Sequence, residues 1–452
     1  MRRSTYVRVI ALGMVLVMLA LCFAGCTPDE GPSLSLGDKE DATPKLYVES
    51  VDVIEGSIIV TYSDGSTKNL GSSVTNVTNN DITINAPEGI QESVLAVSTA
   101  MLSTVGVQCA FTETGYIMNG VWGGGYTTYD KVVYAYGSGV IYELDKTAGD
   151  AYIITNYHVV YDSAAKEEDG ISQNIHVYLR GGSEIMEATF VGGSPIYDIA
   201  VLRVEDNAVL RASAAEAVKV RNSDTLQVGE ASYAVGNPEA GGISATAGIV
   251  SVDSEYITMN AVDGSATNVK FRVVRVDAAI NSGNSGGGLY DAQGNLIGIT
   301  NAKISSSTVE NIGFAIPTTV AVAVAQNVID YHEEDPENNG VYRALMGITT
   351  TISASSMTYD PQTGLTGLTQ TVLVDVVSED GLAQAAGLEK GDALVSIKVG
   401  NRDVVLINRQ HQIIDAMLWA RAGDVITIVY VDTNGVTQTS TITMTAESLQ
   451  KY

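Results

Sequence analysis

The stretch Asn281-Ser282-Gly283-Asn284-Ser285-Gly286-Gly287-Gly288-Leu289 places a serine in a turn that is rich in glycine. A hydroxyl group is a poor nucleophile at neutral pH, so Ser285 needs a neighbouring imidazole as general base. Flanking glycines allow backbone N–H groups to converge on a developing oxyanion. The turn therefore predicts a nucleophilic serine, although the same residues alone are also compatible with an ordinary glycine-rich hairpin.

Two other segments supply the partners that such a serine needs. The apolar run Ile153-Ile154-Thr155-Asn156-Tyr157 leads into His158, and Asp198-Ile199-Ala200-Val201-Leu202 begins a predicted buried strand with an acid. A carboxylate fixes the tautomer of the imidazole and stabilises its charged form. Each part alone is weak evidence, but together they predict a catalytic triad of His158, Asp198 and Ser285. The other histidines, His176, His332 and His411, have no such setting and are expected to be structural or exposed.

The chain around these segments has the pattern of a β protein. From about Glu88 to Ala325 it consists of many short strand-like runs separated by Gly, Asp and Asn. This pattern favours an all-β barrel or sandwich. A helix is predicted from Pro317 to Tyr331, where Thr318-Thr319 can cap it. The Gly- and Tyr-rich segment from Thr112 to Tyr136 is expected to be an extended loop that covers the active site, meets a neighbouring subunit or has no role.

A second globular unit follows the predicted helix. The polar, acidic run from His332 to Gly340 contains Pro336, a helix breaker, and is a linker by composition. Beyond it, strands are expected near Val372–Val377, Ala393–Val399, Val425–Val431 and Thr437–Met444, with a helix near Arg409–Ala420.

The N-terminus has the composition of an export signal. Arg2, Arg3 and Arg8 precede an apolar run from Val9 to Ala24, and small residues follow before a cut site. The sequence Phe23-Ala24-Gly25-Cys26 resembles the lipobox of bacterial lipoproteins, which implies cleavage before Cys26 and diacylation of its sulfur. The alternative, a transmembrane anchor, is disfavoured because spanning a bilayer takes about 20 apolar residues. The predicted leader is 1–25 and a flexible, Pro- and Ser-rich tether is 26–43.

Composition narrows the classes of function. A chain of 452 residues is expected to form two or three units. The formal charge of −27, or −30 once the three arginines of the leader are removed, argues against nucleic acid. Cys109 lies alone in an apolar stretch and is expected in the core. No disulfide framework, metal or cofactor is implied. Residues 44–86, with a hairpin signature at Ser63-Asp64-Gly65-Ser66, predict a small β-rich appendage that is a spacer or a binding module.

The catalytic segments resemble the HtrA/Deg branch of the chymotrypsin-fold serine peptidases. Further similarities are Gly137-Ser138-Gly139-Val140-Ile141, Gly236-Asn237-Pro238, Ala247-Gly248-Ile249-Val250-Ser251 and Asn311-Ile312-Gly313-Phe314-Ala315-Ile316-Pro317. The resemblance implies a mainly β fold, in which two six-stranded β-barrels form a protease domain at 88–330. His158 and Asp198 would come from the first barrel and Ser285 from the second. A linker at 331–342 and a PDZ domain at 343–448 would follow.

The resemblance also assigns roles around the serine. The N–H groups of Gly283 and Ser285 are expected to form the oxyanion hole. Asn284 carries no charge to pair with a new N-terminus, which predicts control by loop ordering rather than by zymogen cleavage. The expected primary specificity pocket carries no acid and favours small aliphatic residues before the cut; it is formed by Ala279, Ile280, Ile312, Gly313 and Phe314.

The C-terminal unit resembles a PDZ domain. Ala344-Leu345-Met346-Gly347-Ile348 resembles a carboxylate-binding loop, and Ala383–Asp392 resembles the helix-turn segment of such domains. The implied partner is a C-terminal peptide, which adds as a strand to a sheet edge. The alternative is a domain that only positions the protease or aids assembly.

Together these features predict a lipid-anchored, ATP-independent serine endopeptidase on the extracytoplasmic face of the cell membrane, periplasmic if the host has two membranes. By resemblance it degrades misfolded or damaged exported polypeptides and forms a homotrimer. Two alternatives stay open. One is a catalytically silent peptide-binding chaperone or sensor, and the other is a surface adhesion or scaffold lipoprotein.

Overall fold

A computed structural model describes residues 48–54, 57–62, 67–69, 92–118, 126–167, 169–180, 185–237, 242–302 and 312–451. The predicted leader, the lipidated Cys26 and the tether lie outside the described residues. Among the residues described, no helix is both long and apolar enough to cross a bilayer. The chain divides into two units, Met1–Asn85 and Ala86–Tyr452. In the first, β1 (Val48–Ile54), β2 (Ser57–Tyr62) and β3 (Thr67–Asn69) form one antiparallel sheet.

The second unit begins with a helix and a closed barrel. The helix α2 (Glu92–Ser103), which the sequence patterns did not predict, leads directly into the first strand. Six strands close in the order β4-β5-β6-β9-β8-β7 around an apolar core. Their bounds are β4 Thr104–Met118, β5 Tyr126–Asp145, β6 Asp150–Thr155, β7 Asn174–Leu179, β8 Met186–Ser194 and β9 Ile199–Val204, with the short helices α3 (Tyr157–Val160) and α4 (Ala208–Ala212) in the connections. Cys109 is fully buried in this core, as expected.

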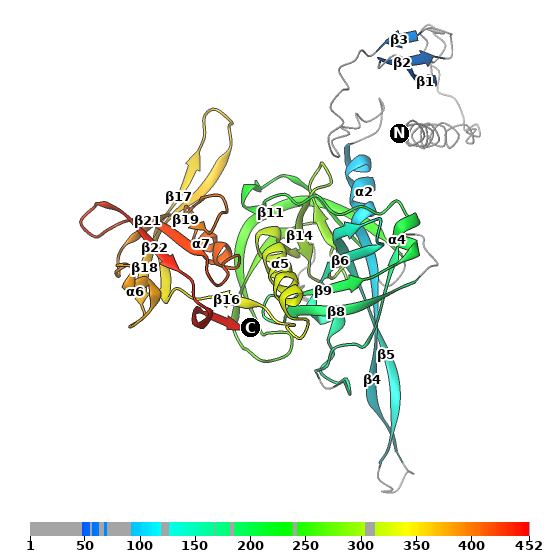
Figure 1. Ribbon diagram of the computed structural model, residues 1–452, viewed down its shortest axis with the longest axis horizontal. Coiled ribbons are helices and arrows are strands. Elements are labelled where there is room, and N and C mark those ends of the chain that lie inside the picture. The colour runs from blue at the N-terminus through cyan, green and yellow to red at the C-terminus, as the bar shows by residue number, and fades with distance from the viewer. Residues whose placement is uncertain are drawn as a thin grey trace, which may run out of the picture. The chain divides into compact units, whose positions relative to one another are not determined.

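A second barrel follows in the chain. Its strands close in the order β10-β11-β12-β15-β14-β13. Their bounds are β10 Ala231–Gly236, β11 Ser244–Met259, β12 Val269–Val276, β13 Gly288–Tyr290, β14 Leu296–Thr300 and β15 Gly313–Pro317, and the 3-10 helix η1 (Ser223–Thr225) precedes them. The double β-barrel expected from the sequence is confirmed. The helix α5 (Thr318–Glu334) then packs against strands of both barrels (Figure 1).

The described parts of the segment expected to be an extended loop, residues 112–118 and 126–136, are strands. β4 and β5 continue as a two-stranded ribbon that projects beyond the barrel, with cross-strand pairs from Thr112↔Val132 to Met118↔Tyr126 (Figure 1). Alternating Thr, Tyr and Val residues favour strands, and the opposed side chains of Glu113 and Lys131 form an ion pair across the ribbon. The glycine and tyrosine content of this segment suggested a loop, but its described residues pair as two antiparallel strands.

The C-terminal domain is built on one sheet with the order β17-β18-β19-β21-β22, to which β20 adds beside β19. The bounds are β17 Ile348–Tyr359, β18 Thr366–Val377, β19 Ala393–Val399, β20 Val405–Leu406, β21 Val425–Val431 and β22 Thr437–Thr443, with the helices α6 (Leu382–Ala385) and α7 (Gln410–Met417). A small two-stranded sheet joins β16 (Tyr342–Ala344) to β23 (Leu449–Lys451) after the 3-10 helix η4 (Ala446–Ser448). The strands β18, β19, β21 and β22 and the helix α7 were predicted, but β16, β17, β20 and β23 were not.

A buried ionic cluster joins α7 to the second barrel. Arg272 of β12 forms ion pairs with Asp224 of η1, at 2.7 Å, and with Asp415 of α7. His411 of α7 also contacts Asp224, with 3.2 Å between its Nε2 and Oδ1 of the acid. Thr319 at the start of α5 donates to Asp415 at 2.9 Å. Because a buried charge is costly unless it is paired, these groups fix how α7 sits on the barrel.

The cluster predicts a dependence of stability on acid. Burial alone would raise the pKa of Asp224, but the hydrogen bond from His411 and the charge of Arg272 outweigh it and lower that pKa to about 2. The pKa of Asp415 is raised, because its deeper burial outweighs Arg272. A folded pKa below the unfolded value stabilises the protein above the unfolded value, and that gain is lost as the pH falls toward 2. The contribution of Asp224 at neutral pH is roughly 2 kcal/mol.

Urea unfolding of the wild type and Asp224→Asn at about pH 6 and about pH 2.5 checks this. At about pH 6 the wild type should have a larger free energy of unfolding than Asp224→Asn. This difference between the two proteins should be smaller at about pH 2.5. Asp206→Asn, which alters a carboxylate that is 92% exposed, is the control and should change little at either pH. A difference between wild type and Asp224→Asn that stays constant with pH would contradict the prediction.

Candidate active site

The structure brings the three predicted catalytic side chains into one hydrogen-bonded chain. His158 lies in α3, directly after β6, and its Nδ1 is 2.7 Å from Oδ2 of Asp198. Its Nε2 is 2.9 Å from Oγ of Ser285, which comes from the turn before β13 of the second barrel. This arrangement can pass a proton from a hydroxyl to an imidazole and leave the serine oxygen free to attack a carbonyl carbon. A carboxylate behind the imidazole stabilises the charge that forms there.

Asp198 is fully buried, and its carboxylate and backbone carbonyl accept hydrogen bonds from several neighbouring groups. Its carboxylate also accepts hydrogen bonds from the backbone N–H of His158 at 3.0 Å and from Nδ2 of Asn301 at 2.7 Å. Its backbone carbonyl accepts from Nδ2 of Asn156 at 2.8 Å. The residue has φ of +49°, which few non-glycine residues adopt. These donors stabilise a carboxylate that would otherwise be costly to bury.

Sequence reasoning missed Asn301. It follows β14 and is fully buried, yet nothing in the local sequence distinguishes it from other polar residues after a strand. Only the closure of the second barrel brings it beside Asp198, which belongs to the first.

The serine turn has a backbone that only glycine adopts easily. Asn284 N–H donates to the carbonyl of Asn281 at 3.0 Å, and Gly283 between them has φ of +93°. A closed four-residue turn with positive φ at its third position is of type II. Gly286 has φ of +83°, and a Cβ there would lie 2.2 Å from the carbonyl oxygen of Ser138. Gly283 is therefore required by its backbone conformation, and Gly286 is required by both its conformation and the lack of space for a side chain.

Ser138 of β5 joins the serine turn to the first barrel. Its N–H donates to the carbonyl of Ser285 at 2.8 Å, and its Oγ donates to the carbonyl of Gly283 at 2.7 Å. The same Oγ accepts from the N–H of Asn237 at 2.7 Å. Ser138 is fully buried. It was noticed in the sequence only as part of a family resemblance, and its role as a brace depends on contacts far along the chain.

Tyr157, which precedes His158 in the chain, and Cys109, in the core of the first barrel, have raised pKa values and stay uncharged at neutral pH. Burial, followed by the negative charges of Asp263 and Asp169, raises the pKa of Tyr157 to about 12. Its ring packs against those of Tyr161 and Phe190. Burial also raises the pKa of the Cys109 thiol to about 12, so this cysteine is an unreactive core residue. Among the described residues, no group of three or more His, Cys, Asp or Glu is placed to hold a metal.

The predicted specificity residues fall into two groups. Ile280 is buried beside Gly313, where an added Cβ would lie 2.8 Å from Cδ1 of Ile280. The carbonyl of Ala279 accepts a hydrogen bond from Oγ1 of Thr246 at 2.8 Å. Phe314 packs against a different apolar cluster from the one that contains Ile280. Ile312 is described and partly exposed, and Asn311 lies outside the described residues.

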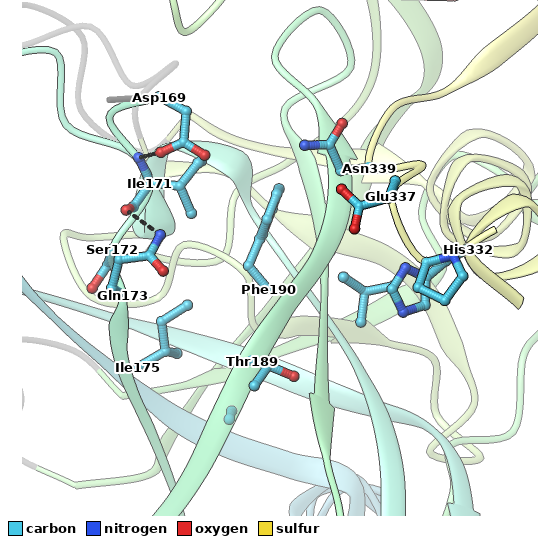
Figure 2. A pocket seen from close by; sticks show the side chains of 13 residues that line it. Asp169, Ile171, Ser172, Gln173, Ile175, Thr189, Phe190, His332, Glu337 and Asn339 are labelled. Atoms are coloured by element: carbon cyan, nitrogen blue, oxygen red, sulfur yellow. Dashed lines mark hydrogen bonds between the residues drawn. The ribbon is translucent and has the colours of Figure 1, made fainter. Parts of the chain in front are cut away.

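A separate hollow of about 300 Å³ contains none of the triad residues. It lies between residues of the first barrel, including Thr189 and Phe190, and the segment after α5 (Figure 2). His332 lies on the side of Glu337 and Asn339, away from Asp169 (Figure 2). The hollow has no nucleophile and base within hydrogen-bonding distance, so it offers no second catalytic centre among the described residues.

Loss of the Ser138 hydroxyl should slow the reaction of Ser285 with a fluorophosphonate, although all three triad side chains remain. Ser138→Ala leaves the carbonyl of Gly283 and the N–H of Asn237 without this partner, and an unpaired buried group costs about 1–3 kcal/mol. The turn that carries Ser285 loses support, so labelling of Ser285 by a fluorophosphonate should slow about tenfold or more.

Ser172→Ala is the matched control for this prediction. Ser172 is also buried, and its Oγ donates to the carbonyl of Ala110 and accepts from the N–H of Asn174, away from the serine turn. It should lower the free energy of unfolding while Ser285 is labelled at the wild-type rate. Equal slowing in both variants would mean that Ser138 acts only through general stability.

Comparisons with known proteins found similar sequences and structures. A family model for the trypsin-like peptidase domain matches residues 137–299. The chain is 31% identical over 345 residues to the serine protease Do-like HtrA of Lactococcus lactis subsp. cremoris, covering 74% of this chain and 78% of that protein. It is 32% identical to the periplasmic serine endoprotease DegP of Escherichia coli, covering 64% of this chain and 53% of DegP. It is also similar to a solved structure of the HtrA-type protease AlgW with decapeptide, at 26% identity and a TM-score of 0.48, covering 80% of this chain and 99% of that chain. Because the first of these relatives aligns over more than three quarters of its own length, the chain belongs to the HtrA family of serine proteases.

Proposed function

We propose that this HtrA-family protease is an exported, lipid-anchored endopeptidase that degrades misfolded or damaged exported proteins. The observation that carries the proposal is the hydrogen-bonded chain from Ser285 through His158 to Asp198, with distances of 2.9 Å and 2.7 Å. The similarity to the periplasmic serine endoprotease DegP supports export, as a property of relatives. Diacylation at Cys26 would hold the enzyme at the membrane, and a homotrimer is expected by resemblance.

The reaction would proceed through an acyl-enzyme. Oγ of Ser285 attacks the scissile carbonyl carbon while its proton moves to Nε2 of His158, and Asp198 stabilises the resulting imidazolium. The N–H groups of Gly283 and Ser285 donate hydrogen bonds to the negatively charged oxygen of the tetrahedral intermediate. His158 then gives its proton to the leaving amine, and the C–N bond breaks. A water molecule, deprotonated by His158, hydrolyses the ester and restores Ser285.

Control would act on the serine turn rather than by cutting a pro-segment. Asn284 holds no charge, so it offers no ion pair to a newly formed N-terminus. Ser138 instead contacts the turn at Gly283 and Ser285. The N–H of Ala302, in the connection after β14, lies 3.3 Å from Oγ of Ser285, and this contact supports regulation by the loops around the turn.

The region before the serine turn supports a preference for small aliphatic residues. Ala279 and Ile280 bring no charge, and Gly313 lies close enough to Ile280 that an added Cβ would nearly touch it. A charged or large side chain would find neither a partner nor much space there.

The C-terminal domain is proposed to bind peptides that end in a free carboxylate. A groove of about 440 Å³ lies between the predicted carboxylate-binding loop and α7. Gly347 in this loop has φ of +81°. The N–H of Leu345 already donates to the carbonyl of Ser448 at 2.8 Å, so the amides of Met346, Gly347 and Ile348 would hold the carboxylate.

The decisive experiment is casein cleavage by the full chain and by Ser285→Ala. The wild type should cut, and the variant should lose at least about 10³-fold in turnover because the triad acts as a unit. A fluorophosphonate should label the wild type alone. If neither form cuts or is labelled, even with C-terminal peptides added, the protein is a peptide-binding sensor or a scaffold instead.

A peptide library tests the specificity. Cleavage should follow Val, Ala or Ile, because the proposed pocket is small and uncharged. Replacing Ala279 by Asp should shift part of the cleavage toward Lys or Arg, since an acid would then face the side chain before the cut. Ala212→Asp, at an exposed position at the end of α4, is the control. A wild type that cuts mainly after Arg would overturn this preference.

A further inference from the structure

One edge of β17 is left open beside α7. Ser378 N–H donates to the carbonyl of Gly347 at 2.8 Å, so the polar groups of Gly347 point toward β18. Because the backbone alternates along a strand, the N–H and C=O groups of Ile348 point the other way, into the groove. The pairing with β18 shifts register between Thr349 and Thr350, and the carbonyl of Thr350 also faces the groove, where α7 contacts it. A peptide added as a strand would pair with these two residues.

The second of these two positions is already occupied. Nε2 of Gln410, the first residue of α7, donates to the carbonyl of Thr350 at 2.8 Å and lies 3.2 Å from its Oγ1. The backbone N–H of Gln410 in turn donates to Oε1 of Gln370 on β18 at 2.9 Å. The side chain of Gln410 therefore bridges the groove, from the start of α7 to the open edge of β17.

This bridge competes with one particular ligand atom. When the terminal carboxylate sits in the loop at Met346 and Gly347, the last ligand residue lies beside Ile348. Antiparallel pairing then places the third residue from the carboxylate beside Thr350. Its N–H needs the carbonyl oxygen that Gln410 now holds.

The helix cannot easily move aside to free that oxygen. Two buried residues of α7 contact the second barrel and its preceding helix η1: His411 hydrogen-bonds with Asp224, and Asp415 forms an ion pair with Arg272. Displacing α7 would break paired charges that are shielded from water, which is costly. Rotation of the Gln410 side chain needs no such loss.

We propose that Gln410 is a latch on the peptide groove: its side chain must leave the Thr350 carbonyl before the groove accepts a third ligand residue. The ligand class is a peptide with a free C-terminus and an apolar last residue, because Leu345, Ile348, Ile413 and Met417 line the groove. The inference rests on the proposed peptide-binding role of this domain. The release of Gln410 is a step that only ligands of three or more residues require. It therefore makes the affinity for a peptide depend on its length, whatever its last residue contributes.

Peptide binding to the full chain in detergent, in a Ser285→Ala background, tests the latch. The probes are acetylated hexapeptides that end in Val, Leu or Phe, measured by calorimetry. Gln410→Met keeps the length of the side chain but removes the donor, and Gln410→Ala removes the side chain. Both should bind about three- to tenfold more tightly than the parent, since a competing neutral hydrogen bond is gone. Gln362→Ala, in the exposed turn of the β17–β18 hairpin, should bind as the parent does.

A second ligand isolates the atom concerned. Replacing the amide N–H of the third residue from the carboxylate by an ester oxygen removes the donor that would take the Thr350 carbonyl. With this ester the advantage of Gln410→Met should disappear or reverse. If the amide peptides bind the parent and both Gln410 variants equally, the latch is wrong and the groove still binds peptides. If they bind none of these proteins, both the latch and the peptide-binding role fall, while casein cleavage tests the protease separately.

Discussion

The contact between Ser138 and the serine turn is the constraint on which the catalytic geometry depends. The triad is divided between two barrels, so its distances are only as fixed as the fit of one barrel against the other. Ser138 is part of a strand of the first barrel and bonds both Gly283 and Ser285. Gly286 must lack a side chain because the carbonyl of Ser138 occupies that space. One small residue thus supports the turn that carries the nucleophile, and its carbonyl also explains a glycine that the chemistry alone does not require.

Two buried side chains, Asp198 and Arg272, are stabilised in the same way, by hydrogen-bonding or charged partners from distant parts of the chain. Asp198 is ionisable and fully buried, and it is surrounded by donors from His158 and Asn301. Arg272 is buried between two acids, one from each side of the contact with the C-terminal domain. In both cases the partners come from elements far apart in sequence. Such charges penalise every arrangement in which the elements are displaced, because displacement leaves a buried charge without its partner.

Local patterns in the sequence predicted a β protein, the three candidate catalytic residues and the strands β18, β19, β21 and β22, whereas the double barrel was expected from the family resemblance. Strands alternate, and the turn around Ser285 has its own glycine pattern. Asn301, the bracing role of Ser138 and the position of Gln410 had no such signal, since each depends on a partner that only tertiary closure supplies. The ribbon of β4 and β5 was misjudged because glycine and tyrosine content was weighed above the alternation of its side chains.

The two faces of α7 differ in what they allow. The face with His411 and Asp415 is bound to the barrel by paired charges, and the face with Ile413 and Met417 lines the groove. A helix fixed on one side cannot adapt to a ligand by moving as a body. Selection must then come from side chains that rotate, and the first residue of the helix is the one that reaches the open strand. The same paired charges that place the C-terminal domain on the protease therefore limit how its groove can respond.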